Sequence, residues 1–188
     1  MNKKGLILVI TGCILIIIAG LMVVYNNYEN KQAAIESKKV YEKIQEVESN
    51  EENTLVNEEM KVVNIDGNEY IATIDIPALN LKLPVMADWD YDKMKISPCK
   101  YYGSIFTNDL VLCAHAYDSL FGKIKNLQTG DLLILKDMDD NEYIYKVEMI
   151  EILSPKDVKK MIDSPFDLTL YTCTSDNLNR VTVRLNRV

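Results

Sequence analysis

Three residues of this 188-residue chain have types and positions that could support covalent chemistry. His115, the only histidine, follows the apolar run 110–114, Cys173 ends the apolar run 168–173, and Arg180 opens the last apolar run. A thiol becomes an effective nucleophile when an imidazole handles the protons of the reaction, and an arginine can stabilise the negative charge that develops. Reactive side chains at strand ends predict a catalytic site on a rim of the fold, provided that the fold brings them together.

Each of these residues also has an ordinary structural interpretation. A single histidine after a buried strand is often only hydrogen-bonded, and a single cysteine in an apolar strand is often a small core residue. An arginine in a terminal strand commonly lies on a solvated face. From spacing alone, a non-catalytic scaffold or binding domain therefore remains an alternative to an enzyme.

Composition excludes several classes of protein. A single histidine excludes sites that need two, including most catalytic zinc sites. The net charge of −7 argues against nucleic acid or an anionic surface as a specific partner. The acidic residues 137, 139, 140 and 142 lack the spacing of an EF-hand, and we interpret them as a solvated hairpin turn. We expect no cofactor and no required metal.

The N-terminal part of the chain reads as a membrane anchor. Residues 6–25 contain no charged side chain and are long enough to cross the hydrocarbon core of a bilayer. Lys3 and Lys4 precede this run, which predicts a cytoplasmic tail at 1–5 and an extracellular remainder at the cell membrane. A cleaved signal peptide is the alternative, but the run is long and no small-residue cleavage site follows it.

Residues 26–60 separate the anchor from the rest of the chain as a stalk or linker. They are rich in good helix formers, and their apolar stripe is sparse, formed by Ile35, Val40, Ile44 and Val47. We therefore expect a solvated helical spacer.

From residue 61 to 188 the pattern is typical of a mainly β domain. Short alternating or continuous apolar runs separated by turn residues predict strands and favour a closed or nearly closed barrel. Two short helices are expected, one over 119–127 and one starting at Ser154 with Pro155 at its first position. The predicted strands cover 70–76, 79–83, 110–114, 132–135, 143–152, 168–173 and 181–185.

Three local sequences of this domain resemble the sortase family. The segment TLYTC at 169–173, followed by Arg180 in the strand VTVR, resembles the TLxTC active-site motif. The segment LCAHAYDSLFGKIKNLQTGD at 112–131 is similar to the region around the family's histidine, and IATIDIPALNLKLPV at 71–85 is similar to the start of its barrel. Ala116 departs from the family pattern, in which asparagine often follows the histidine.

The resemblance implies a closed eight-stranded sortase-type β-barrel and a cysteine transpeptidase, closest to class B or class D. Cys173 would attack the carbonyl of threonine in a C-terminal sorting motif of a secreted protein and form a thioester. His115 would act as acid and base, Arg180 would stabilise the oxyanion, and Thr172 would help to position the oxyanion or the substrate. The acceptor would be an amine of a cell-wall peptide or of a pilin lysine.

Two further questions stay open at the level of sequence. A hydrolytic cysteine peptidase differs from a transpeptidase only in whether water or an amine resolves the thioester. The loops 86–102 and 154–166 are expected to shape the peptide groove, but they carry no readable specificity code. Cys13 is interpreted as an apolar filler of the anchor, and Cys99 and Cys113 as buried residues for which a disulfide is conceivable.

Overall fold

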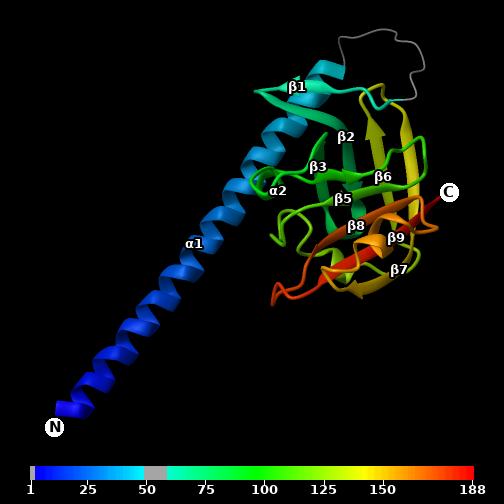
Figure 1. The fold of residues 1–188 in the computed structure, drawn as a ribbon. Helices are drawn as coiled ribbons and strands as arrows, with labels where there is room; N and C mark the ends of the chain where they lie inside the picture. Colours follow the sequence, from blue (N-terminus) through cyan, green and yellow to red (C-terminus); the bar gives the residue numbers. More distant parts are fainter. Residues whose placement is uncertain (1–2, 49–58) are drawn as a thin grey trace. The chain divides into compact units, whose positions relative to one another are not determined.

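The computed structural model describes the backbone of residues 3–48 and 59–188 (Figure 1). Residues 1–2 of the predicted tail and residues 49–58 of the predicted linker lie outside this description. Contacts divide the chain into two compact units, Met1–Gln32 and Ala33–Val188, and the first helix, α1 (Lys3–Glu48), contributes to both.

The first unit contains the apolar part of α1. Within the described residues, one helix is long and apolar enough to cross a membrane, and it begins near the N-terminus. Its large apolar side chains from Ile7 to Val24 are exposed, which is what a segment surrounded by lipid requires. This helix fits a single-pass membrane anchor.

The second unit is built mainly of β-strands. Asp66 and Gly67 both have positive φ and form the two-residue turn between its first two strands. Short helical segments interrupt the strands: η1 (Pro77–Leu79), α2 (Lys93–Ile96), η2 (Ile124–Asn126) and α3 (Val158–Ile162). The strands are β1 (Val63–Ile65), β2 (Asn68–Ile76), β3 (Leu81–Met86), β4 (Cys99–Tyr102), β5 (Leu110–Cys113), β6 (Leu132–Asp137), β7 (Glu142–Leu153), β8 (Leu168–Cys173) and β9 (Arg180–Arg187).

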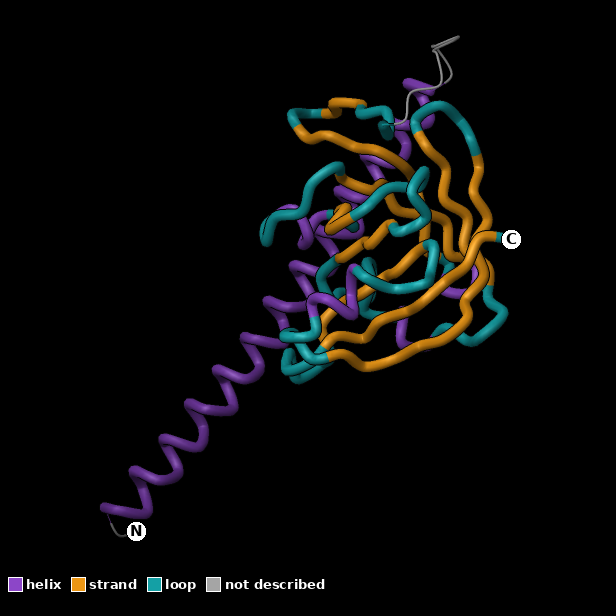
Figure 2. Tube along the Cα trace, turned by 45° about the vertical axis from the view of Figure 1, so that its right-hand side comes forward, coloured by secondary structure: helices purple, strands orange, loops and turns teal. Residues whose placement is uncertain are grey.

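The sheet closes on itself into a barrel (Figures 1 and 2). Neighbouring strands follow the order β1-β2-β3-β4-β5-β8-β9-β7-β6, and β6 pairs back onto β2. Eight strands from β2 to β9 therefore form the closed ring, while β1 is an additional strand on β2. Most pairs are antiparallel, but β3–β4 and β5–β8 are parallel. The predicted closed eight-stranded barrel is confirmed.

Strict alternation places every second side chain of the barrel strands in its interior. On β8, Leu168 and Leu170 belong to the main hydrophobic core, and on β9 the same holds for Val181, Val183 and Leu185. The residues between them point to the outer face. The sequence pattern of these strands therefore determines which side chains are available on the outside of the barrel.

The predicted strands all occur, with small shifts of their ends. The strand expected from residue 79 begins at Leu81, because Pro77 starts a 3-10 turn that ends at Asn80. The strands β1 and β4 were not predicted. The helix expected over 119–127 is wrong, since only Ile124–Asn126 is helical there, and the helix expected from Ser154 begins at Val158.

The expected solvated spacer is also wrong for the part of α1 that lies in the second unit. Ala33, Ser37, Val40 and Ile44 are buried and follow one another at helical spacing on one face of α1. Val40 and Ile44 pack in one cluster with side chains of β2, β3, β4 and β5. This end of α1 is therefore part of the packed domain.

The buried face of α1 predicts that isoleucine-to-alanine substitutions at a buried and at an exposed position of this helix differ in their effect on stability. Ile44→Ala should lower the free energy of unfolding by about 2–5 kcal/mol, because the side chain is 1% exposed. Ile35→Ala, at a position that is 62% exposed, should change it by less than about 0.5 kcal/mol. Denaturant unfolding of the detergent-solubilised full chain, followed by the fluorescence of its single tryptophan, measures both. Equal effects would contradict the packing of α1 on the barrel.

Candidate active site

The parallel pairing of β5 with β8 sets side by side the two chain segments that lead to His115 and Cys173. Cys113 on β5 is the partner of Tyr171 on β8, and both strands end at these positions or just beyond them. The pairing continues past the end of β5, because the Ala114 N–H donates to the carbonyl of Tyr171 at 3.4 Å. Extended two residues beyond the pair Cys113–Tyr171, this register sets His115 level with Cys173, although His115 follows the end of β5 and is not among the residues that line the cleft described below.

The antiparallel pairing of β8 with β9 places Arg180 opposite Cys173. The two residues are the last pair of this ladder, and directly opposite residues project from the same face of a sheet. Alternation places both on the outer face of the barrel, since Val181 and the neighbouring Leu170 lie in the core. Arg180, Cys173 and His115 are all partly buried.

The loop 174–179 holds this last pair in register. The Thr174 N–H donates to the carbonyl of Asn179 at 2.9 Å, and the Asn179 N–H donates to the hydroxyl oxygen of Thr174 at 3.0 Å. Asp176 accepts hydrogen bonds from Thr174 and from the Leu178 N–H, which lower the pKa of its carboxyl group. The loop is therefore tied across its own ends next to Cys173.

The backbone and the ring of His115 are both held by neighbours. Its N–H donates to the carbonyl of Met94 in α2 at 3.0 Å. Its ring stacks on Tyr117, with 4.2 Å between ring centroids and an interplanar angle of 24°. Contacts from α2 and from the chain after β5 thus fix the strand exit that carries the imidazole.

Thr172 lies on the opposite side of β8 from Cys173 in the strand alternation. Its side chain is buried, and its hydroxyl donates to the carbonyl of Ala114 at 2.8 Å. This bond joins the residue before Cys173 to the residue before His115. The structure therefore gives the hydroxyl proton of Thr172 an acceptor within the protein.

A cleft of about 260 Å³ lies over Cys173 and Arg180. The segment around α2 and the segment around α3 form two of its walls. The predicted groove loops 86–102 and 154–166 both contribute to its lining, which confirms their position beside the site. The lining residues are Trp89, Tyr91, Met94, Tyr101, Ala114, Ser154, Pro155, Asp157, Val158, Met161, Tyr171, Thr172, Cys173 and Arg180.

Aromatic rings form a continuous row in this cleft. Trp89 packs against Tyr101 with 5.6 Å between ring centroids, and Tyr101 meets Tyr171 edge to face at 5.4 Å. Tyr101 and Tyr171 also pack against a small apolar cluster of Val111, Leu153 and Met161. The interior of the cleft is therefore apolar and aromatic, with the thiol and the guanidinium at one side.

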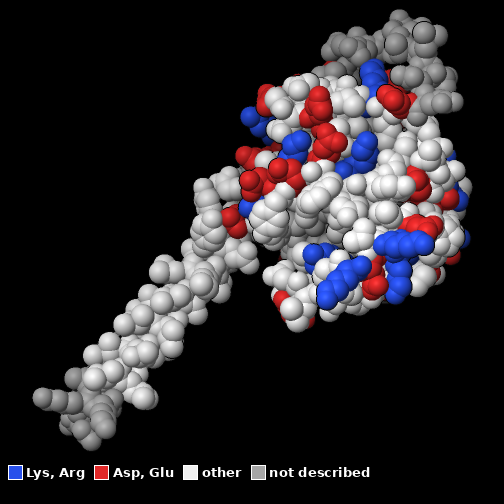
Figure 3. Space-filling model, viewed as in Figure 1, with Lys and Arg blue, Asp and Glu red and all other residues white. Residues whose placement is uncertain are grey.

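Charged side chains of both signs lie around this mostly uncharged region (Figure 3). Next to α2, Lys95 pairs with Asp92 at 2.8 Å, and at α3, Lys160 pairs with Asp157 at 3.4 Å. The lining of the cleft contains one acidic and one basic side chain, Asp157 and Arg180, among residues that are otherwise uncharged.

Cys99 and Cys113 are buried, whereas Cys173 is partly exposed. Burial raises the pKa of the Cys113 thiol to about 12, and it raises the pKa of Cys99 as well. Burial also raises the pKa of Tyr171, while the nearby charge of Arg180 acts in the opposite direction. Cys99 and Cys113 are free thiols on directly opposite positions of β4 and β5.

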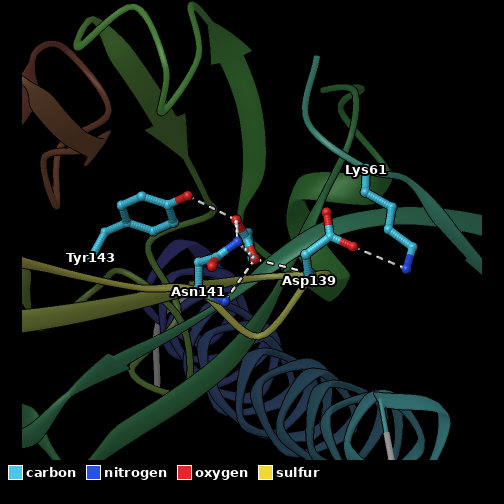
Figure 4. Close-up of polar contacts among 5 residues, drawn as sticks. Lys61, Asp139, Asn141 and Tyr143 are labelled. Carbon is cyan, nitrogen blue, oxygen red and sulfur yellow. Dashed lines mark hydrogen bonds and ion pairs between the residues drawn. The ribbon is translucent and has the colours of Figure 1, made fainter. Parts of the chain in front are cut away.

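The acidic hairpin between β6 and β7 differs from the solvated turn that we expected (Figure 4). Asp137 is buried, and its carboxylate accepts from the N–H groups of Asp139 and Asn141, both at 2.9 Å, and from the hydroxyl of Tyr143 at 2.8 Å. Asp139 pairs with Lys61 at 3.1 Å. The hairpin's own donors thus occupy the Asp137 carboxylate, and the described residues hold no cluster of His, Cys, Asp and Glu suited to a metal ion.

A sequence model of the sortase domain matches residues 74–188. The chain belongs to the sortase family. The match begins within β2 and covers the rest of the barrel, including β8 and β9, which carry Cys173 and Arg180, and the segment after β5 that carries His115. None of the curated proteins compared with this sortase matches it.

Solved sortase structures have the same fold. Sortase C1 from Streptococcus agalactiae is 28% identical over 66% of this chain and 70% of its own, with a TM-score of 0.58. Sortase A from Corynebacterium diphtheriae is 20% identical, with 90% and 95% covered and a TM-score of 0.57. Sortase D5, a transpeptidase from Clostridium perfringens, is 18% identical, with 86% and 99% covered and a TM-score of 0.56. These similar scores do not separate the classes, so the resemblance to class B or D stays a prediction.

Sequence reasoning did not identify the contacts that hold the site together. The carbonyl of Met94, which accepts from the His115 N–H, is a backbone group, and no pattern of side chains in the sequence predicts this hydrogen bond. The aromatic row could have been suspected from the tyrosines at 101 and 171, but only the pairing of β4, β5 and β8 aligns them. The partners of Thr172 likewise depend on the parallel register of β5 and β8.

Selective alkylation tests the different settings of these cysteines. At about pH 8, native protein treated with iodoacetamide should be modified at Cys173 and not at Cys113, because a thiol with a pKa of about 12 is almost wholly protonated there. Raising the pH to about 9 should leave Cys113 protected, since its thiolate forms only as the pH approaches the raised pKa. Peptide mass spectrometry with a second, isotopically heavy reagent added after denaturation reads the sites.

Denatured protein, in which all thiols should react, is the control for this labelling. Equal labelling of Cys113 and Cys173 in the native state would contradict the burial described above. If Cys99 and Cys113 took up the heavy reagent only after reduction, they would be paired by a disulfide in the isolated protein.

Proposed function

We propose that this protein is a membrane-anchored sortase that cleaves a C-terminal sorting motif after threonine and transfers the secreted protein to an amine. The observation that carries the proposal is the meeting of three strand ends. Cys173 and Arg180 are cross-strand partners, and His115 leaves the neighbouring parallel strand at the same level. Cys173 and Arg180 line the mostly apolar cleft, and His115 directly follows Ala114, which also lines it.

In the first half of the reaction, the Cys173 thiolate attacks the threonine carbonyl. The C–S bond forms, and the carbonyl electron pair moves onto oxygen, where the fixed positive charge of Arg180 stabilises it. When this intermediate collapses, the C–N bond of the peptide breaks. Protonated His115 gives its proton to the departing amine, which leaves a thioester on Cys173.

In the second half, an incoming amine attacks the thioester. Neutral His115 takes the proton that this amine loses, and Arg180 again stabilises the oxyanion. The C–S bond then breaks and returns the Cys173 thiolate. An imidazole suits both steps because its ordinary pKa of about 6.5 lets it gain and lose a proton near neutral pH.

Thr172 supports this chemistry indirectly. Its hydroxyl bonds the carbonyl of Ala114, so it joins the strand exits that carry the nucleophile and the imidazole. We assign it a positioning role for His115. Direct donation to the oxyanion would require this bond to break.

The mostly apolar lining of the cleft supports an extended peptide with apolar side chains as the first substrate. Its aromatic row offers rigid apolar surface to side chains of the motif, while the ends of β8 and β9 carry the reacting groups. The acceptor amine belongs to a cell-wall peptide or a pilin lysine, and no resident cofactor or metal takes part in this proposal.

The apolar helix supports a location of the reaction at the cell membrane. Lys3 and Lys4 before the apolar helix favour a cytoplasmic N-terminus and an extracellular barrel. Protease added to intact cells should therefore degrade the barrel, while a tag fused before Lys3 stays intact until the cells are permeabilised. Digestion of the tag in intact cells would contradict this orientation.

Capture of the thioester tests the three proposed catalytic residues. The protein is incubated with a small library of Leu-Pro-x-Thr and Asn-Pro-x-Thr peptides, and the intact mass of the adduct is measured. Cys173→Ala should abolish the adduct, because no thiolate remains to form it. His115→Ala and Arg180→Lys should slow turnover by at least about a hundredfold, since each removes a group that acts in the transition state.

Cys113→Ala is the matched control, because it removes a buried cysteine near the site that has no role in the proposed chemistry. It should retain the adduct and turnover. Failure of the wild-type protein to form any adduct would favour the non-catalytic scaffold. Release of the acid product at the same rate with and without added amine would instead favour a hydrolytic peptidase.

A further inference from the structure

The most deeply buried cation of the described barrel is Arg184, and the proposed chemistry does not use it. Its side chain is 2% exposed, and it lies on the same outer face of β9 as Arg180. In the ladder with β8, Arg184 is the partner of Thr169. A charged group is rarely buried so completely unless its partners are well placed.

The guanidinium of Arg184 binds four oxygens. Its Nε–H donates to the carboxylate of Glu151 on β7 at 2.8 Å, and one terminal nitrogen donates to the hydroxyl oxygen of Thr169 on β8 at 2.8 Å. The carbonyls of Lys160 and Met161 accept from its two terminal nitrogens at 2.7 and 3.2 Å. One side chain thus ties β7, β8 and α3 to β9.

The contacts to α3 satisfy carbonyls that the helix itself leaves open. The last turn of any helix has carbonyl oxygens without partners in the helix. Lys160 and Met161 belong to the last turn of the five-residue helix α3, so Arg184 caps its C-terminal end. A helix this short has little stability of its own, and its position depends on such tertiary contacts.

The helix that Arg184 holds is a wall of the cleft. Val158 and Met161 of α3 line the cleft, as does Asp157 immediately before it. Met161 is therefore bound through its carbonyl by Arg184, while its side chain packs beneath the cleft with Val111 and Leu153. Displacement of α3 would change the shape of the cleft without touching Cys173.

We propose that Arg184 is a positioning residue that fixes α3 as the wall of the peptide-binding cleft and so determines affinity for the sorting peptide. Its consequence for the peptide rests on the proposed sortase function, whereas the tether itself does not. On the outer face of β9, Arg180 then acts at the reacting carbonyl, and Arg184 holds α3 in place.

Lysine cannot replace arginine in this role. The guanidinium is planar and presents donors in several fixed directions, which is how it reaches acceptors on three elements at once. The ammonium group of lysine keeps the charge, but it is compact and cannot donate to the same four oxygens at once. Arg184→Lys therefore removes the tether to α3 while preserving the charge.

Kinetics of the full-length protein in detergent test the proposal. Arg184→Lys should raise KM for the peptide by about tenfold, the scale set by losing a hydrogen bond to a charged group. KM for the amine and the rate at which iodoacetamide alkylates Cys173 should stay within about twofold of wild type, because the reacting groups are undisturbed. Arg187→Lys is the matched control on the same strand, since Arg187 is exposed and lies over the ring of Tyr143.

A second pair of variants covers the case in which Arg184→Lys does not fold. Thr169→Val removes one acceptor of the guanidinium, and Thr169→Ser restores a hydroxyl at the same place. Thr169→Val should raise KM for the peptide, and Thr169→Ser should return it towards wild type. Unchanged peptide KM in both Arg184→Lys and Thr169→Val would overturn the proposal.

Hydrogen exchange separates this proposal from the proposed function. The amides of residues 159–163 should exchange at least about tenfold faster in Arg184→Lys than in Arg187→Lys, while those of β8 stay protected. Faster exchange in a protein that forms no thioester would support the tether and reject the proposed transpeptidase activity. Unchanged exchange in an active enzyme would reject the tether and leave the proposed function intact.

Discussion

The parallel pairing of β5 with β8 is the constraint on which the arrangement of the site depends. Parallel strands end at the same edge of a sheet, so residues that follow them meet there even when they are distant in sequence. His115 and Cys173 satisfy this condition through the pair Cys113–Tyr171 and the bond from Thr172 to Ala114. The antiparallel return of β9 then adds Arg180 from the other side.

The sequence predicted the most apolar strands of the barrel better than the elements around them. Continuous apolar runs identified β5, β8 and β9, because buried barrel strands must be apolar on their inner face whatever they pair with. β4 reads CKYY and has no such pattern, since its pairing with β5 and its aromatic contacts stabilise it. β1 was missed although Asp66 and Gly67 are a strong signal for a tight hairpin.

The wrong expectations share a physical cause. The stripe on α1 looks sparse because Ala33 and Ser37 are small, yet small side chains are what allow a helix to approach a sheet closely. The segment 119–127 has helix-forming residues, but it folds as turns that place Leu120 and Phe121 in the core. Local preference was outweighed by burial in both places, and contacts such as Arg184 to α3 could not be read from any local pattern.

The loop 174–179 limits where the chain tolerates insertions and deletions. Because Val181, Val183 and Leu185 are buried and β9 pairs with both β7 and β8, the register of β9 is fixed, and one residue inserted or deleted here must be absorbed between Cys173 and Arg180. Such a change would disrupt the hydrogen bonds between Thr174 and Asn179 that join the ends of the loop next to Cys173. Single-residue insertions and deletions are therefore far less tolerable here than substitutions, although the loop lies at the surface where length variation is usually harmless.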